Sequence, residues 1–145
     1  MVELRKTSDK DIKLIGNLLF SEKAKYIKYF NPFNNNKELI ESYKNEFNIF
    51  YTIFLKNTLV GFVMLRGLDL KQKRFGIYIS SKHSSKGYSK IAIYKFLKII
   101  KSNYEIKKIH LKVHKKNLQA VSLYLNFGFK VVKEDSDEFI MCFEL

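Results

Sequence analysis

The stretch that decides the fold is residues 77–113, which read IYISSKHSSKGYSKIAIYKFLKIIKSNYEIKKIHLKV. An apolar run from Arg74 to Ser80 predicts a strand, and a loop of small residues follows it. Apolar residues then recur at helical spacing from about Gly87 to Ser102, and Ile109 to Val113 alternate as strand residues do. Because a helix joins the two strands, they must run parallel in one sheet with a right-handed crossover.

The other segments predict a sheet that is otherwise antiparallel. Lys56-Asn57 separates two β-like runs as a tight turn does, and Gly128 follows a short helix as a C-terminal glycine commonly does. The chain of 145 residues shows no domain boundary, so residues 1–145 are expected to form a single domain. In chain order, the expected elements outside residues 74–113 are a strand at Val2 to Lys6, a helix with Ile12, Ile15, Leu18 and Leu19, a helix with Leu39, Ile40, Tyr43 and Phe47, strands at Phe50 to Leu55 and Leu59 to Arg66, a helix at about Leu118 to Asn126, and strands at Phe129 to Lys133 and Phe139 to Leu145.

The chain is strongly basic, with a formal net charge of +13. This balance favours an acidic partner, although a lysine-rich composition is also what an AT-rich genome encodes. The basic residues are scattered, so they do not predict a nucleic-acid-binding surface. No apolar run is long enough to span a membrane, the charged start from Met1 to Lys6 is unlike a signal peptide, and Cys142 is a single cysteine. We expect a cytoplasmic protein with no membrane or nucleic-acid partner.

The loop from Ser84 to Ser89 leads from a strand into the long helix. Backbone N–H groups at a helix N-terminus are unpaired and carry partial positive charge, so they bind phosphates readily. Gly87 and Ser89 are small enough for a ligand to approach the backbone, and Lys86 and Lys90 add positive charge. The loop is therefore a candidate phosphate site, and an ordinary strand-to-helix loop is the alternative.

A second stretch, residues 117–129, reads NLQAVSLYLNFGF. It resembles a signature of the GNAT superfamily of N-acetyltransferases: Asn, two residues, Ala, three residues, Tyr, three residues, Gly-Phe. All five named positions match.

The loop before the long helix resembles the family's acetyl-CoA pyrophosphate loop. The pattern of that loop is Arg or Gln, two residues, Gly, one residue, and Gly or Ala. It falls on Ser84, Gly87 and Ser89, and only Gly87 matches strictly. The resemblance covers about residues 59–133 and implies the GNAT fold, an α/β (α+β) fold with a mixed, mostly antiparallel six- to seven-stranded sheet, a central parallel strand pair and about four flanking helices.

The resemblance also implies chemistry, with acetyl-CoA as cosubstrate and no metal. Tyr124 matches the tyrosine that protonates the leaving CoA thiolate, and a packed core tyrosine is the alternative reading. Asn117 is expected to bond the cofactor or to cap its helix. The other cofactor-binding positions that the resemblance implies are Ile77, Tyr78 and Ile79 on the strand, through their backbone, and Ser84, Ser85, Lys86, Gly87, Tyr88 and Ser89 in the loop.

The acceptor side carries weaker signals. Arg66 ends a predicted strand and is suited to pairing with a carboxylate or phosphate on the acceptor; a solvated arginine is the alternative. Phe30 and Phe33, in the aromatic segment from Tyr26 to Asn36, are expected to wall the acceptor pocket or simply to pack on the sheet. The strand before the loop holds no carboxylate, so the general base stays open among Asp69, Glu38, Glu41, His83, His110 and His114.

We therefore expect an acetyl-CoA-dependent N-acetyltransferase that acts on a primary amine of a small, phosphate-bearing molecule. A looser resemblance of Arg74 to Tyr78 and Asp135 to Cys142 to the sugar-nucleotide amine N-acetyltransferases of bacterial surface-glycan biosynthesis favours a nucleotide-linked amino sugar, and the chain is compatible with a homodimer. A protein N-terminal or other small-amine acetyltransferase is the alternative enzyme. The alternatives outside enzymes are a degenerate CoA-binding module and a nucleic-acid-binding protein.

Overall fold

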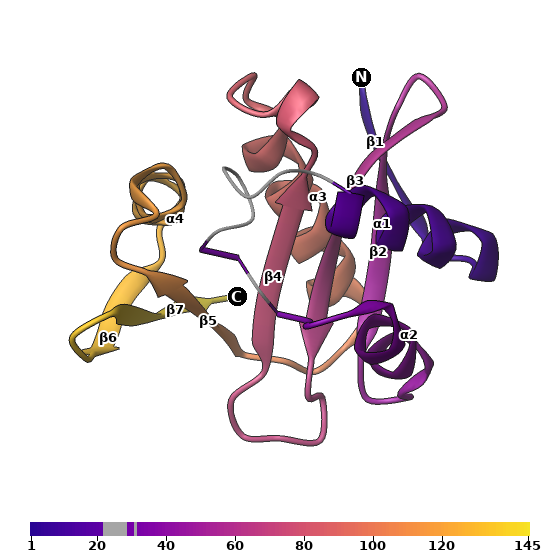
Figure 1. Ribbon diagram of the computed structural model, residues 1–145. Helices are drawn as coiled ribbons and strands as arrows, with labels where there is room; N and C mark the ends of the chain where they lie inside the picture. Colours follow the sequence, from indigo (N-terminus) through magenta and orange to yellow (C-terminus); the bar gives the residue numbers. More distant parts are fainter. Residues whose placement is uncertain (22–28, 31) are drawn as a thin grey trace.

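A computed structural model describes residues 1–21, 29–30 and 32–145 of the chain (Figure 1). The order of elements agrees with the sequence prediction, and most boundaries shift by one residue. In chain order the elements are β1 (Val2–Lys6), α1 (Asp9–Ser21), α2 (Asn36–Lys44), β2 (Ile49–Leu55), β3 (Thr58–Arg66), β4 (Arg74–Ile79), the short 3-10 helix η1 (Ser81–His83), α3 (Tyr88–Asn103), β5 (Lys108–His114), α4 (Leu118–Phe127), β6 (Lys130–Glu134) and β7 (Glu138–Glu144).

The described strands form one mixed sheet in the order β1-β2-β3-β4-β5-β7-β6. β4 and β5 are parallel, with α3 as their crossover, and all other neighbours are antiparallel. Lys56 and Asn57, which join β2 to β3, both have positive φ angles of 47° and 68°, as a two-residue hairpin turn of type I′ requires. The predicted mixed sheet with one central parallel pair is confirmed.

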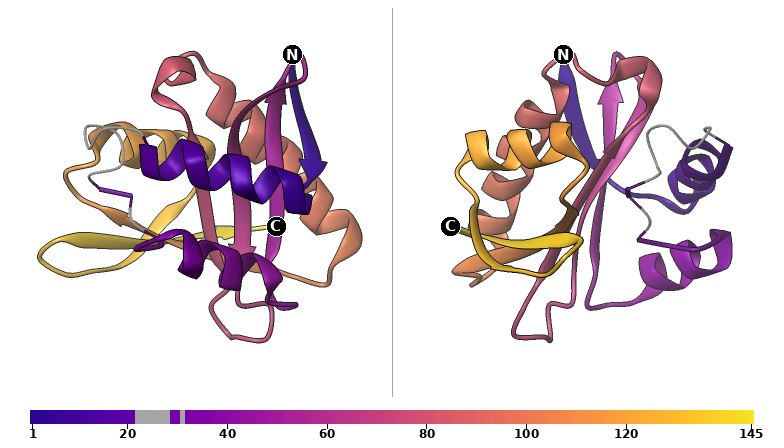
Figure 2. Two further views of the ribbon diagram at one scale, coloured as in Figure 1. Left: turned by 45° about the vertical axis from the view of Figure 1, so that its right-hand side comes forward. Right: turned by 60° about the vertical axis from the view of Figure 1, so that its left-hand side comes forward.

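Helices cover both faces of the sheet, as Figure 2 shows. On one face, α1 and α2 bury Ile12, Ile15, Leu19 and Leu39 against side chains of β2, β3 and β4. On the other face, α3 buries Ile93, Phe96 and Ile100, and α4 adds Tyr124. Because strand side chains alternate between faces, even-numbered residues of β3 and β4, such as Phe62, Met64 and Tyr78, face α1 and α2.

The predicted apolar face of the second helix is wrong at its end. α2 ends at Lys44, and Phe47 is exposed. Asn45 leaves the helical conformation, with φ −73° and ψ 123°, and its side-chain oxygen accepts a hydrogen bond from the Phe47 backbone N–H at 2.8 Å. This local bond turns the chain toward β2 in place of another helical turn.

None of the helices in the described residues has the length and apolar character needed to cross a membrane.

Candidate active site

The parallel strands β4 and β5 diverge soon after they meet (Figure 1). In the described residues, their register contains the single pair Arg74–His110, reinforced by a 2.8 Å hydrogen bond from the His110 N–H to the Lys73 carbonyl. From Phe75 to Ile79, the edge of β4 that faces β5 is therefore not covered by that strand. A cavity of about 360 Å³ opens at this divergence, lined by β4, the loop before α3, and α4.

The loop before α3 lies at one end of this cavity, which Ser84, Ser85, Gly87 and Ser89 all line. Gly87 is the N-cap of α3 and has a φ angle of 83°, a left-handed value that glycine adopts at little cost. A Cβ atom at Gly87 would meet no described atom within 4 Å. The backbone here is accessible to a ligand, and the free N–H groups of the first helical turn follow directly.

Tyr124 forms part of the cavity wall from α4. Its side chain is 7% exposed, and its ring packs edge to face against Phe75 and Phe129, with centroids 6.3 and 5.6 Å away. Burial raises the pKa of the Tyr124 hydroxyl well above its usual value. The phenol is therefore neutral at physiological pH and holds a proton that it can donate.

The start of α4 is tied both to its own backbone and to the loop before α3. The Asn117 side-chain oxygen accepts a hydrogen bond from the Ala120 N–H at 3.3 Å, as an N-cap does, and Asn117 also lines the cavity. Gln119 donates from Nε2 to the Ser85 Oγ at 2.6 Å. This bond joins two segments that approach the cavity from opposite sides.

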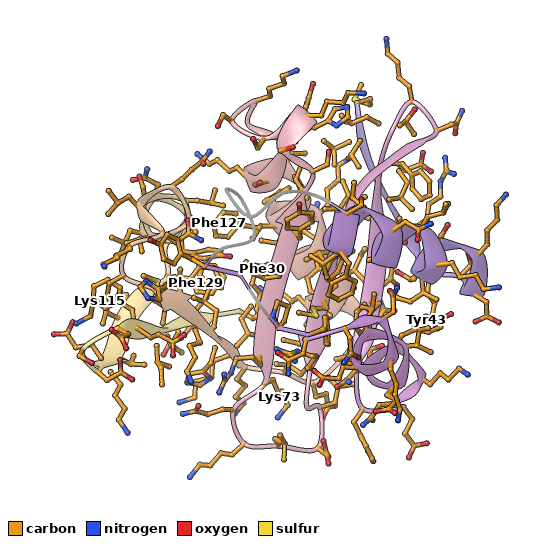
Figure 3. The ribbon with its side chains drawn as sticks, viewed as in Figure 1. Phe30, Tyr43, Lys73, Lys115, Phe127 and Phe129 are labelled. Carbon is orange, nitrogen blue, oxygen red and sulfur yellow. The ribbon has the colours of Figure 1, made fainter. Side chains whose placement is uncertain are left out.

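A second cavity, of about 280 Å³, adjoins the first and shares with it Tyr29, Phe30, Phe75, Gly76 and Lys112. Phe30 lies against β4 (Figure 3) and stacks on Tyr78 at a centroid distance of 5.8 Å. Arg66 lines the second cavity, and its guanidinium lies 5.3 Å from the centre of the Phe33 ring.

Phe33 itself is buried in the core against Phe50 and is not among the residues that line either cavity. The expected wall of the acceptor pocket thus holds Phe30 directly, whereas Phe33 lies behind Arg66. Tyr26 falls outside the described residues.

Comparison with known proteins identifies the family. Residues 18–129 match the acetyltransferase (GNAT) family model. The chain belongs to the GNAT family of acetyltransferases. It is 31% identical over 104 residues to a spermidine N(1)-acetyltransferase of Thermoplasma acidophilum, a match that covers 72% of this chain and 64% of that protein.

Solved structures agree on the GNAT fold. A domain from Methanocaldococcus jannaschii superposes with a TM-score of 0.82 at 22% identity, over 100% of this chain and 99% of that one. Spermidine N-acetyltransferase from Vibrio cholerae, solved in complex with CoA and spermine, superposes with a TM-score of 0.81 at 23% identity, over 99% of this chain and 95% of that one.

The six candidate bases are all absent from the described lining of the first cavity of this GNAT domain. Glu38 accepts hydrogen bonds from the Asn34 backbone and side chain, which lower the pKa of its carboxyl group. His83 shares a 2.9 Å hydrogen bond with Ser80. The His114 ring packs against the Tyr29 ring in a tilted arrangement, with centroids 4.6 Å apart. Glu41 and Asp69 are exposed, and Asp69 lines a further depression that shares Arg66 and Arg74 with the second cavity. His110 is buried, and its Nδ1 has no hydrogen-bond partner.

Sequence reasoning missed two kinds of site residue. Gln119 lies inside the quoted signature but at a position that the GNAT pattern leaves free, so only the fold reveals its bond to Ser85. Glu138 lines the second cavity from β7 and forms a 3.4 Å ion pair with Lys112 of β5. Its place depends on the pairing of β5 with β7, which joins residues far apart in the chain.

Two of the cofactor positions that the resemblance implied, Lys86 and Tyr88, are not among the residues that line the cavity. Lys86 is exposed, and Lys90, in the first turn of α3, lines the cavity instead. In the part of the chain that the structure describes, no three His, Cys, Asp or Glu side chains are grouped so that they could hold a metal ion.

Proposed function

We propose that this GNAT-family chain is an N-acetyltransferase, which moves the acetyl group of acetyl-CoA to the primary amine of a small molecule. The observation that carries the proposal is the cavity between the diverging strands β4 and β5. It combines an uncovered strand edge, a glycine-containing loop at a helix N-terminus and a buried, neutral tyrosine.

The donor is proposed to lie along this cavity, with its pyrophosphate on the backbone from Ser84 to Ser89 and its pantetheine arm beside Ile77, Tyr78 and Ile79. The open backbone at Gly87 supports the first contact. The uncovered edge of β4 supports the second, because free N–H groups there can also stabilise the oxyanion that forms at the thioester carbonyl. The positive charge of Lys90 at the cavity adds to the attraction for phosphate.

In the proposed reaction, the amine nitrogen attacks the thioester carbonyl carbon, and the C–S bond then breaks. The departing sulfur takes the proton of the Tyr124 hydroxyl, and the amine nitrogen loses a proton. Because burial raises the pKa of Tyr124, its donation must be coupled to the return of a proton, either from the amine nitrogen or through solvent. Glu138 is the carboxylate that the described lining of the two cavities offers to an amine proton.

The acceptor is proposed at the level of a small primary amine. Two of the three proteins named above are spermidine acetyltransferases, which favours a polyamine as a second candidate acceptor. The nucleotide-linked amino sugar rests on sequence resemblance alone and stays a prediction, as do the single domain, the cytoplasmic location and the homodimer.

A transfer assay tests the proposal. Acetyl-CoA and a panel of small amines are incubated with the protein, and both free thiol and acetylated amine are measured. Replacing Tyr124 with Phe keeps the packed ring and removes the hydroxyl, so we expect fold and CoA affinity to persist while turnover falls by about 10²-fold. Tyr94→Phe is the matched control, since Tyr94 is 57% exposed on α3.

Amine-dependent thiol release that disappears in Tyr124→Phe but not in Tyr94→Phe supports the proposal. Wild-type turnover in Tyr124→Phe, under conditions where chemistry limits the rate, would remove the hydroxyl from the mechanism and leave Tyr124 as a packing residue.

A further inference from the structure

We propose that the acceptor carries an oxyanion, a carboxylate or a phosphate, which binds between Arg66 and Arg74. The inference rests on the proposed function, because it concerns the second substrate of the same site. It goes further by naming the chemistry of that substrate, and it predicts that an amine with an oxyanion is preferred to a simple polyamine.

The two arginines face each other across neighbouring strands. Arg66 of β3 and Arg74 of β4 are register partners, and both line the second cavity. Side chains directly opposite in an antiparallel pair have Cβ atoms about 4.5–5.5 Å apart, and like charges in such positions destabilise the sheet. The fold therefore places the two arginine side chains next to each other on the face that α1 and α2 cover, and both reach the same cavity.

Neither guanidinium forms an ion pair with a carboxylate of the described residues. The Nε of Arg66 is buried without a hydrogen-bond partner. Burial, with a further contribution from the charge of Arg74, lowers the pKa of Arg66, although an arginine remains charged throughout the physiological range. The Phe33 ring is a weak substitute for a counter-ion, because a cation over an aromatic face gains far less than a charge-assisted hydrogen bond.

The charges that line the second cavity are unbalanced. Arg66, Arg74 and Lys112 are cationic, and Glu138 is the one anionic side chain among its described lining residues. Glu138 is paired with Lys112 at 3.4 Å. Asp69 lines a neighbouring depression with both arginines, but among the described residues neither Asp69 nor any other carboxylate forms an ion pair with Arg66 or Arg74. A polyamine would bring further positive charge to this pair, whereas a carboxylate or phosphate would accept the hydrogen bonds of the guanidinium forks.

The position of the pair also suits an acceptor. Gly76 lies two residues after Arg74 and lines both cavities. One small molecule can therefore place an amine at the uncovered edge of β4 and an oxyanion at the arginines.

The test measures the melting temperature of the CoA-saturated protein in sodium phosphate and in sodium chloride at equal ionic strength. Saturation with CoA keeps phosphate away from the proposed pyrophosphate loop. Wild type, Arg66→Gln and Arg74→Gln are compared, and Lys101→Gln serves as control because it removes an exposed cation from α3 on the opposite face.

We expect phosphate to raise the melting temperature of wild type and Lys101→Gln by about 2–4 °C more than that of either arginine variant. An equal effect of phosphate in wild type and in both arginine variants would overturn the inference, because phosphate would then act without the arginine pair.

A second arm uses acceptor pairs that differ by one oxyanion: lysine against cadaverine, and phosphoethanolamine against ethanolamine, with spermidine added. A preference of the wild type for the anionic amine of each pair supports the inference if Arg66→Gln loses that preference through a higher KM for the anionic amine. Preference for cadaverine or spermidine would overturn it and leave the acetyltransferase standing. If none of these amines is acetylated, the comparison of melting temperatures in phosphate and chloride tests the inference by itself. The proposed function fails separately, if acetyl-CoA neither binds nor is consumed.

Discussion

Tyr124 and His110 both have buried side chains that can ionise, and their surroundings shift their pKa values in opposite directions. Burial raises the pKa of the Tyr124 phenol. Burial lowers the pKa of the His110 imidazole, and the positive charges of Lys108 and Arg74 lower it further. Both side chains are therefore neutral at physiological pH, Tyr124 with a proton to donate and His110 without a positive charge beside the arginines.

The lowered pKa of His110 predicts a loss of stability in mild acid. Below its ordinary pKa of 6.5, the unfolded chain binds a proton at this residue that the folded chain resists, so the free energy of unfolding falls as the pH falls through this range. We expect wild type to lose more stability between about pH 7.5 and pH 5.5 than His110→Gln does. Urea denaturation at the two pH values measures the difference, with His114→Gln as control. A pH dependence unchanged in His110→Gln would contradict this account.

At the scale of elements, the succession of β4, the loop and α3 is the feature that the sequence predicted best, although the short helix η1 within the connection was not predicted. The sequence alone predicted a glycine at the start of the helix and a strand before it. The GNAT signature at residues 117–129 indicated the family. The divergence of β4 from β5 left no trace in residue types, because it is a property of backbone spacing. The bond between Gln119 and Ser85 was equally invisible, because it joins segments 34 positions apart.

Gly87→Ala tests the loop as a donor site. At a φ angle of 83°, a Cβ atom costs about 1–2 kcal/mol, and it adds bulk to open space at a residue that lines the proposed donor cavity. We expect a lower melting temperature and a weaker affinity for CoA, measured by calorimetric titration.

Gly67→Ala is the matched control for this loop. Its φ angle is 77°, and its Cβ would lie 2.9 Å from Leu70 Cδ1, away from the first cavity. It should lose stability but keep its CoA affinity, so equal losses of affinity in the two variants would remove the loop from the donor site.

At the scale of the whole molecule, the sheet has two covered faces, one packed against α1 and α2 and the other against α3 and α4. The order of elements predicted the sheet and its parallel pair, because chain order and connection lengths constrain topology strongly. Prediction of the acceptor side was weaker. The sequence singles out Arg66 as one of three arginines in a lysine-rich chain and as the end of a predicted strand, but its partner Arg74 follows from the register of β3 with β4. Phe33 was expected either to wall the pocket or to pack on the sheet, and it packs in the core against Phe50. Residue type alone does not separate these two places for an aromatic side chain.

The central claim is that the cavity between β4 and β5 binds acetyl-CoA through its pyrophosphate. Thermal melts of the wild-type protein with CoA, and separately with pantetheine, which lacks the pyrophosphate and nucleotide, measure this most directly. A ligand that binds only the folded state stabilises it by about 2.7 kcal/mol at a concentration of 100 Kd. We predict a rise of several degrees with CoA and a much smaller one with pantetheine at equal concentration. No rise with saturating CoA, or an equal rise with pantetheine, would contradict the account.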